Sequence, residues 1–140
     1  MIVVDVNVVA YTLIEGDWTV DAKRLRTLDP HWRLPRLWRY EFVNLLATYR
    51  RAGGMSEPRA RDLLRAALAY YGPAELEPDQ DAVLQAASQH RITGYDAEYV
   101  ALALRLGVKL VTEDEPLRRA VPGAAISIKG AIARALPPPS

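Results

Sequence analysis

The sequence predicts an α/β fold built around a mainly parallel sheet. Two observations predict it: the expected strands are short, continuous apolar runs, and helical patterns alternate with them along the chain. Continuous apolar runs suit a parallel sheet covered on both faces, whereas a half-exposed strand alternates polar and apolar residues. The alternation of strands with helices favours parallel strands joined by helical crossovers.

Five segments are expected to be strands, and the first of them is the most apolar. They are residues 2–4, 32–35, 74–76, 109–112 and 125–128. Their lengths are those of short strands buried inside a small domain.

Six segments are expected to be helices, because apolar residues recur at helical spacing and capping or breaking residues bound them. The helix at 19–28 has Thr19 as a possible cap and ends before Asp29-Pro30. The helix at 37–52 carries an apolar stripe and ends at Gly53-Gly54. The others begin at Ser56 or span 79–90, 95–106 and 116–120.

The composition is that of one domain, expected at 1–135, followed by a proline-rich tail at 136–140. Half of the 140 residues are hydrophobic, which is enough for a core. The absence of cysteine excludes a disulfide scaffold, a thiolate zinc site and a cysteine nucleophile. The chain shows no apolar run long enough to span a bilayer and no signal-peptide pattern, so we expect a cytoplasmic protein with no membrane partner.

Two carboxylates follow directly after expected strands. Asp5 comes after the most apolar run, and Asp114 comes after residues 109–112. Ligands of open parallel sheets bind just beyond the carboxyl ends of strands, so both acids lie where a site is expected. Each also fits a second interpretation as a helix cap. Glu113 and Glu115 flank Asp114, and the residues alone leave open which of the three faces a site.

Two further carboxylates lie on the apolar faces of expected helices. Glu41 follows Trp38 by three residues and therefore shares its helix face. A buried carboxylate needs a cation, either a metal ion or an arginine, unless it reaches solvent at the edge. Asp96 begins an inward stripe that continues at Val100, and with Thr93 it also fits a capping box.

Together, these four acids are expected to meet at one edge of the sheet. Close together they would repel one another and raise their own pKa values, and a divalent cation removes that repulsion. Ligand sets made only of oxygen suit Mg²⁺ or Mn²⁺ better than zinc. Because the four contribute −4 to a net charge of +1, the rest of the chain is basic, which suits a polyanionic partner. An ordinary mixed surface would give the same charge.

Four segments of the chain resemble the acidic motifs of the PIN domain, and in particular those of the VapC-type toxins of toxin–antitoxin pairs. They occur in the family's order between residue 1 and about residue 130. The segments are Val4-Asp5-Val6-Asn7-Val8, Tyr40-Glu41-Phe42-Val43-Asn44-Leu45-Leu46, Tyr95-Asp96-Ala97-Glu98-Tyr99-Val100-Ala101-Leu102-Ala103 and Leu110-Val111-Thr112-Glu113-Asp114. One departure is Val6, where the family more often has threonine or serine.

The resemblance implies a three-layer α/β/α sandwich with a mainly parallel sheet of four to five strands. It also implies a Mg²⁺- or Mn²⁺-dependent endoribonuclease that acts on RNA, forms a homodimer and is held silent by a cognate antitoxin. Among the three neighbouring acids it selects Asp114. Asn7 and Thr112 match family positions that support the acidic cluster by hydrogen bonds.

On this basis the four acids are expected to be both catalytic residues and metal ligands. Asp5, Asp96 and Asp114 would hold the principal ion, while Glu41 would hold a second ion or orient the attacking water. The alternative of one ion remains open, because substrate phosphate often completes a Mg²⁺ shell.

Three arginines, Arg33, Arg36 and Arg39, are interleaved with aromatic residues around the end of the second expected strand. Arginine binds phosphate through two N–H groups, and aromatic rings stack on unpaired bases, so this segment is a candidate path for RNA. Arg36 is the first candidate among them. The other interpretation, favoured for Trp38, is a solvated helix start with aromatic residues in the core.

Two other functions compete with a nuclease. One is a non-catalytic RNA- or protein-binding module on a PIN-like fold, which has no need of four carboxylates. The other is a phosphotransfer receiver or a phosphatase with Asp5 as nucleophile. A receiver carries its nucleophile on a later strand, and the phosphatase pattern has a second aspartate where Asn7 stands.

Overall fold

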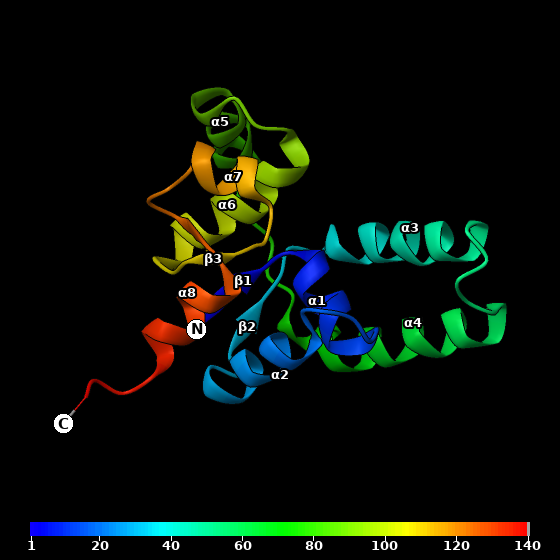
Figure 1. Ribbon diagram of the computed structural model, residues 1–140. Coiled ribbons are helices and arrows are strands. Elements are labelled where there is room, and N and C mark those ends of the chain that lie inside the picture. The colour runs from blue at the N-terminus through cyan, green and yellow to red at the C-terminus, as the bar shows by residue number, and fades with distance from the viewer. Residues whose placement is uncertain (140) are drawn as a thin grey trace.

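The computed structural model describes residues 1–139 and has the α/β architecture expected from the sequence (Figure 1). Within this range four strands form one parallel sheet in the order β2-β1-β3-β4. The strands are β1 (Ile2–Val4), β2 (Trp32–Arg33), β3 (Leu110–Val111) and β4 (Ala125–Ile126). The α-helices are α1 (Val6–Leu13), α2 (Thr19–Leu28), α3 (Trp38–Arg51), α4 (Glu57–Tyr71), α5 (Gln80–His90), α6 (Gly94–Leu106), α7 (Glu115–Ala120) and α8 (Ile128–Ala135).

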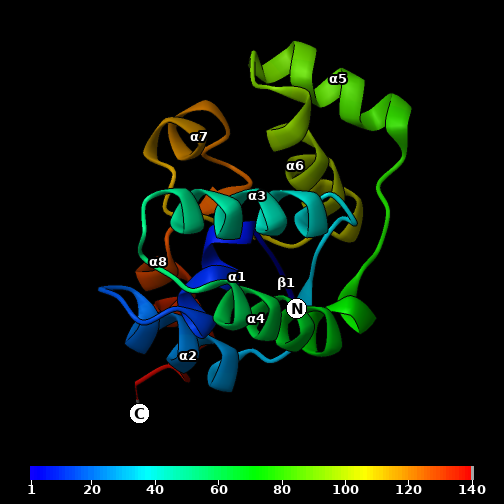
Figure 2. The same ribbon diagram turned by 90° about the vertical axis from the view of Figure 1, so that its right-hand side faces the viewer.

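Helices cover the sheet on both faces, which gives the expected three layers (Figures 1 and 2). On one face α2 packs against α1 and α8, and on the other α6 lies against β1 and β3 and carries α5. All three residues of β1 are buried, as a strand covered on both faces requires. No helix within residues 1–139 is both long enough and apolar enough to cross a bilayer.

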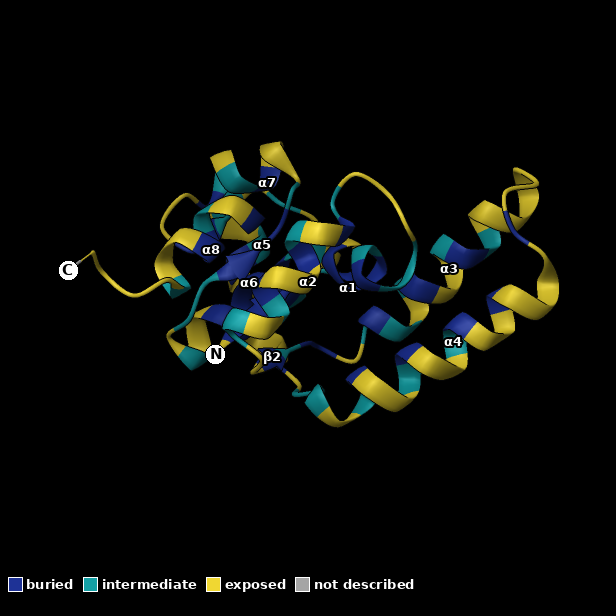
Figure 3. Ribbon diagram, turned by 60° about the horizontal axis from the view of Figure 1, so that its bottom comes forward, coloured by how far each residue is buried: buried dark blue, intermediate teal, exposed yellow. Residues whose placement is uncertain are grey.

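A hairpin of α3 and α4 extends beyond the sheet (Figures 1 and 3). The turn at its far end uses Gly53 with a φ of +75°, a conformation that glycine adopts without strain. Its near end is part of the core, where Trp38 packs against Phe42 and Tyr71 with ring centroids 6.1 Å apart in both pairs. The indole Nε1 of Trp38 donates a hydrogen bond to Glu75. The interpretation of Trp38 as a core residue is therefore confirmed.

Most of the expected elements are present, and their ends follow the residues that predict them. The α4 cap is Ser56, whose Oγ accepts a hydrogen bond from the Arg59 N–H, and α6 ends at Gly107 with a φ of +66°. The expected capping role of Thr19 is wrong. Thr19 is the first residue of α2, and its hydroxyl donates to the Ile14 carbonyl, so it closes the preceding loop.

Two expectations about strands are corrected. Residues 74–76 do not form a strand, because Gly72–Ala74 makes a turn of 3₁₀ helix and leaves a single parallel bridge between Leu34 and Glu75. The strand expected at 125–128 ends at Ile126. Ser127 then accepts a hydrogen bond from the Gly130 N–H and begins α8, a helix that the sequence did not predict.

The order in which strands are added to the sheet reverses at β1, and this reversal determines where the site lies. The first crossover leads from β1 to β2, and the next returns past β1 to β3 on its other side. The carboxyl ends of β1 and β3 therefore lie side by side at a switch point, where open α/β sheets bind their ligands. Asp5 follows β1 and Thr112 follows β3 at this edge.

The core at the base of the hairpin yields the first prediction. Trp38→Ala removes a fully buried indole and a hydrogen bond, so we expect the free energy of unfolding to fall by about 3 to 5 kcal/mol. Tyr40→Ala, an exposed aromatic on the same helix, is the matched control and should change it by less than about 1 kcal/mol. Urea denaturation checks both variants, and equal losses would contradict the assignment of Trp38 to the core.

Candidate active site

Asp5 joins the end of β1 to the start of α1. Its backbone is extended, and its Oδ1 accepts a hydrogen bond from the Val8 N–H at 3.0 Å, which makes it the cap of α1. Its Oδ2 accepts a hydrogen bond from the hydroxyl of Thr112, beyond the end of β3. Asp5 is thus a helix cap, as one interpretation expected, and it also lies at the sheet edge where a site was expected.

Thr112 links the two neighbouring strand ends. The residue is fully buried, and its Oγ1 donates to Asp5 while it accepts from the Asp114 N–H at 3.0 Å. Asp114 in turn caps α7, because its Oδ1 accepts from the Leu117 N–H at 3.1 Å. One hydroxyl therefore fixes both the Asp5 carboxylate and the backbone that carries Asp114.

The two glutamates beside Asp114 have other partners. Glu113 accepts a hydrogen bond from the Ile128 N–H at 3.2 Å and lies 3.5 Å from Arg118. Arg118 also donates a hydrogen bond to the Thr112 carbonyl at 2.7 Å, so the Glu113–Arg118 ion pair stabilises the loop after β3. Glu115 is exposed in the first turn of α7. Of the three acids, Asp114 is the one whose charge acts on both Asp5 and Asp96.

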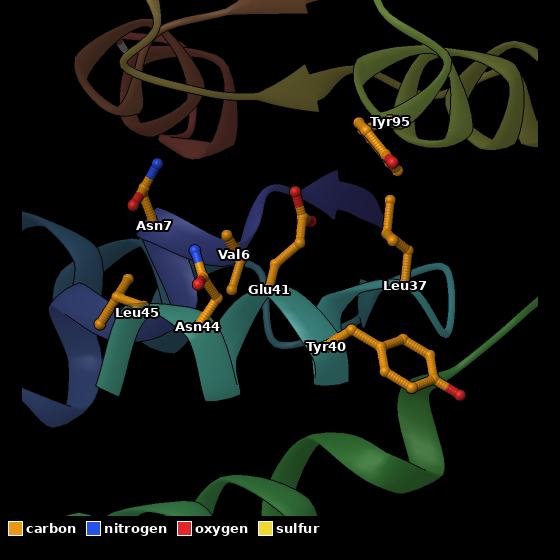
Figure 4. A pocket seen from close by; sticks show the side chains of 8 residues that line it. All are labelled: Val6, Asn7, Leu37, Tyr40, Glu41, Asn44, Leu45 and Tyr95. Atoms are coloured by element: carbon orange, nitrogen blue, oxygen red, sulfur yellow. The ribbon is translucent and has the colours of Figure 1, made fainter. Parts of the chain in front are cut away.

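Glu41 comes from α3 and Asp96 from α6, and both are partly buried. The Glu41 side chain points into the space between α1, α3 and α6 (Figure 4), and its Oε1 accepts a hydrogen bond from the hydroxyl of Tyr99. Asp96 lies in the first turn of α6, where its N–H donates to the Thr93 Oγ1 at 3.0 Å. The capping role expected of Thr93 is confirmed.

Burial raises the pKa of three of the four carboxyl groups. The pKa of Asp5 rises to about 6, chiefly through burial and also through the charge of Asp114, while hydrogen bonds from Thr112, Val8 and Asn7 act in the opposite direction. For Glu41, burial and the charges of Asp5 and Asp96 raise the pKa, and the Tyr99 hydroxyl partly offsets them.

The same causes act on the remaining members of the cluster. Burial raises the pKa of Asp96, and the charge of Asp114 adds to the effect. Burial and the neighbouring Glu41 carboxylate raise the pKa of the Tyr99 phenol, so the phenol keeps its proton and donates a hydrogen bond to Glu41. Asp5, Glu41 and Asp96 are therefore each close enough to another acid of the cluster for its charge to raise their pKa values.

The donor set fits a hard divalent cation, although its side chains are turned toward protein partners. In the part of the chain that the structure describes, no three acidic or histidine side chains converge closely enough to hold one ion as they stand. Asp5 and Asp114 accept backbone N–H groups, and Glu41 accepts the Tyr99 hydroxyl. Carboxylate oxygens are nevertheless the ligands that Mg²⁺ and Mn²⁺ prefer.

A side cavity of about 540 Å³ opens next to Glu41. Figure 4 shows its walls, which come from the start of α1, the first turns of α3 and the start of α6. The lining residues are Val6, Asn7, Leu37, Tyr40, Glu41, Asn44, Leu45 and Tyr95. Asn7, expected to support the acids, therefore borders both the cavity and the end of β1.

The three candidate RNA-binding arginines lie near the start of α3 in different environments. Arg36 is exposed, and its backbone N–H donates to Glu77 at 2.7 Å. Arg39 forms an ion pair with Glu75, and Arg33 is partly buried in β2. Among them Arg36 has the most exposed side chain for a phosphate.

Sequence reasoning did not assign roles to three residues that shape the site. Tyr99, the partner of Glu41, lies three residues after Asp96 on the same helix, and this spacing is the signal that places both on one face. Asn44 follows Glu41 by the same three residues and lines the side cavity with it. The role of Arg118 has no such signal in the sequence, because its partners, the Thr112 carbonyl and the Glu113 carboxylate, lie six and five residues before it in an irregular loop.

Comparison with known proteins finds similarity at the level of family, sequence and structure. The PIN domain family matches residues 2–121. Ribonuclease VapC3 of Pyrobaculum aerophilum is 32% identical over 127 residues, which cover 86% of this chain and 95% of that protein. The crystal structure of PAE2754 from Pyrobaculum aerophilum matches with a TM-score of 0.73 and 26% identity, covering 96% of this chain and 95% of that one.

The raised pKa of Asp5 predicts a stability difference that depends on pH. In metal-free protein the folded state holds this proton up to about pH 6, whereas an unfolded aspartate loses it near 3.8, so its contribution to stability is lost as pH rises between these values. Asp5→Asn removes the titration and keeps an acceptor oxygen for the Val8 N–H, while its NH2 group can donate to the Thr112 hydroxyl oxygen. We therefore expect the free energy of unfolding of the variant, relative to that of wild type, to rise by up to about 3 kcal/mol between pH 4 and pH 7.5.

Urea denaturation in EDTA at the two pH values measures this change. Asp81→Asn makes the same substitution at an exposed aspartate in the first turn of α5 and controls for the loss of one negative charge. A difference between wild type and Asp5→Asn that is the same at both pH values would show that Asp5 titrates normally.

Proposed function

The chain is a VapC-type member of the PIN-domain family, and from this relationship we propose that it is a Mg²⁺- or Mn²⁺-dependent endoribonuclease, the toxin of a toxin–antitoxin pair. The observation that carries the proposal is the gathering of Asp5, Glu41, Asp96 and Asp114 at one edge of the sheet, where three of them have raised pKa values. Such a cluster is unfavourable when ionised, and a divalent cation is the partner that makes it favourable.

Each acid would have a role set by the element that carries it. Asp5, Asp96 and Asp114 would hold the principal ion, and Glu41 would hold a second ion or orient the attacking water. When bound, the ion lowers the pKa of a water molecule and stabilises charge on phosphoryl oxygens. Each carboxylate oxygen of Asp5, and Oδ1 of Asp114, now accepts a hydrogen bond from the protein, and a second lone pair on each of these oxygens would serve an ion.

Neighbouring residues would position the acids. Thr112 holds one Asp5 oxygen with its hydroxyl and one Asp114 N–H with its lone pair, so it sets the spacing of these ligands. Tyr99 would orient Glu41 through its hydrogen bond, which also partly offsets the rise in the pKa of Glu41 caused by burial. Asn7 lies at the mouth of the side cavity beside Glu41, where its amide can complete the polar edge.

The RNA backbone would approach along the start of α3. Arg36 is the proposed phosphate contact, because its side chain is exposed and it lies just before α3, the helix that carries Glu41. Arg33 and Arg39 would add positive charge to this path, although Arg39 is also held by Glu75. The similarity to Ribonuclease VapC3 supports RNA as the substrate.

The same relationship supports the proposed partners. A VapC-type toxin would be a homodimer silenced by a cognate antitoxin and would act in the cytoplasm. Residues 1–135 would form its single nuclease domain.

The proposal predicts RNA cleavage that depends on both metal and acids. With Mn²⁺, single-stranded RNA should be cleaved, EDTA should stop the reaction, and Asp5→Asn or Asp96→Asn should lower kcat/KM by at least about a hundredfold, since each removes a proposed ligand. Asp81→Asn should cleave at the wild-type rate. The assay follows a fluorescently labelled RNA on gels, with circular dichroism to confirm folding.

Cleavage that persists in EDTA would contradict metal dependence. RNA binding without cleavage at millimolar Mn²⁺ would favour the non-catalytic module.

The proposed phosphate contact predicts a change in salt dependence. In the catalytically silent Asp5→Asn background, Arg36→Ala should weaken binding to single-stranded RNA and reduce the slope of log K against log salt by about 0.7. Arg24→Ala, which removes an exposed arginine of α2, should leave the slope unchanged. Fluorescence anisotropy at several salt concentrations measures both, and unequal affinity with an equal slope would show that Arg36 does not bind phosphate.

A further inference from the structure

The side cavity beside Glu41 has a chemical character different from that of the acidic edge. Its walls are mostly apolar or aromatic, and besides two tyrosine hydroxyls its polar side-chain groups are one carboxylate and two amides. Within the described part of the chain, no lysine or arginine lines it. An anionic phosphate would therefore find no positive charge there, whereas a neutral ring with hydrogen-bonding edges would find both apolar walls and amide partners.

Tyr95 and Leu37 form one end of this cavity. Figure 4 shows the Tyr95 side chain reaching from the start of α6 toward Leu37, with Glu41 beside them. The Tyr95 side chain is 67% exposed, so its ring face is accessible to a ligand. A tyrosine ring opposite an aliphatic side chain is a surface on which a planar base stacks.

Asn44 supplies a polar group on the other side of Glu41. It lies one helical turn after Glu41 on α3, and its amide projects into the same cavity (Figure 4). An asparagine amide offers one acceptor and a donor group together, the combination that reads the edge of a base.

The cavity adjoins the acidic cluster, because two of its lining residues lie close in sequence to two of the acids. Tyr95 directly precedes Asp96, and Asn44 follows Glu41 by three residues. A ring that occupies the cavity would therefore be carried by a nucleotide whose phosphate lies at the acidic cluster.

We propose that the side cavity binds one unpaired nucleobase of the RNA, that of a nucleotide adjoining the cleaved phosphodiester, with Tyr95 stacking on the base and Asn44 hydrogen-bonding its edge. This inference rests on the proposed ribonuclease function and adds a base subsite to it. It makes Tyr95 and Asn44 determinants of cleavage position.

Abasic nucleotides test the proposal directly. A set of labelled RNA oligonucleotides carries one abasic site at each position around the bond that wild type cleaves with Mn²⁺. At one position next to that bond, removal of the base should lower kcat/KM of wild type about tenfold. Tyr95→Ala should cleave the intact RNA about tenfold more slowly in kcat/KM, mainly through a higher KM, and should lose nothing further at that abasic position.

Matched variants separate stacking from general effects. Tyr95→Phe keeps the ring and should retain wild-type behaviour, while Asn44→Ala should reduce discrimination among the four bases at the same position. Tyr49→Ala, a partly exposed tyrosine of α3 outside the cavity, should cleave like wild type.

The outcomes also separate this inference from the proposed function. One outcome is that wild type cleaves RNA in Mn²⁺ while each abasic position lowers kcat/KM by the same factor in wild type and in Tyr95→Ala. That result would overturn the base subsite and leave the proposed ribonuclease function intact. An unchanged KM in Tyr95→Ala would overturn the base subsite as well. If wild type does not cleave any RNA, the proposed function itself fails.

Discussion

The repulsion among four carboxylates at one edge of a parallel sheet is the constraint on which the rest of the site depends. Burial and mutual charge raise the pKa of Asp5, Glu41 and Asp96, so the folded chain carries an unfavourable charge cluster at neutral pH. Hydrogen bonds from Thr112 and Tyr99 offset part of this cost. A divalent cation would offset the remainder, which explains why a small domain can keep these acids together.

The fold gathers the acids from separate parts of the chain. The reversal at β1 places the ends of β1 and β3 side by side, which brings Asp5 next to Thr112 and the loop that carries Asp114. Helices α3 and α6 then deliver Glu41 and Asp96 to the same edge, and the buried packing of Trp38 fixes the near end of α3. Packing of the core at Trp38 therefore also positions Glu41, one turn further along α3.

Local sequence signals predicted most of the elements, whereas the choice of partners required the folded chain. Glycine and capping residues marked the ends of α4 and α6. Helix α8 was missed because its apolar start continues the run of β4, and Gly130 lowers the helical propensity that would have marked it. The residues could not select Asp114 over Glu113, because contacts with Ile128 and Arg118, distant in sequence, turn Glu113 away. Asp114 was selected only by the resemblance of this segment to the PIN-domain motif.

Metal binding with proton release is the measurement that tests the charged cluster most directly. Titration calorimetry with Mn²⁺, in two buffers of different ionisation enthalpy, gives the number of protons released per ion. Because the pKa of Asp5 is about 6, binding at pH 6 should release about half a proton or more, and binding at pH 8 should release almost none. The absence of binding at millimolar Mn²⁺, or a proton release that is equal at both pH values, would contradict a cation site built on these four acids.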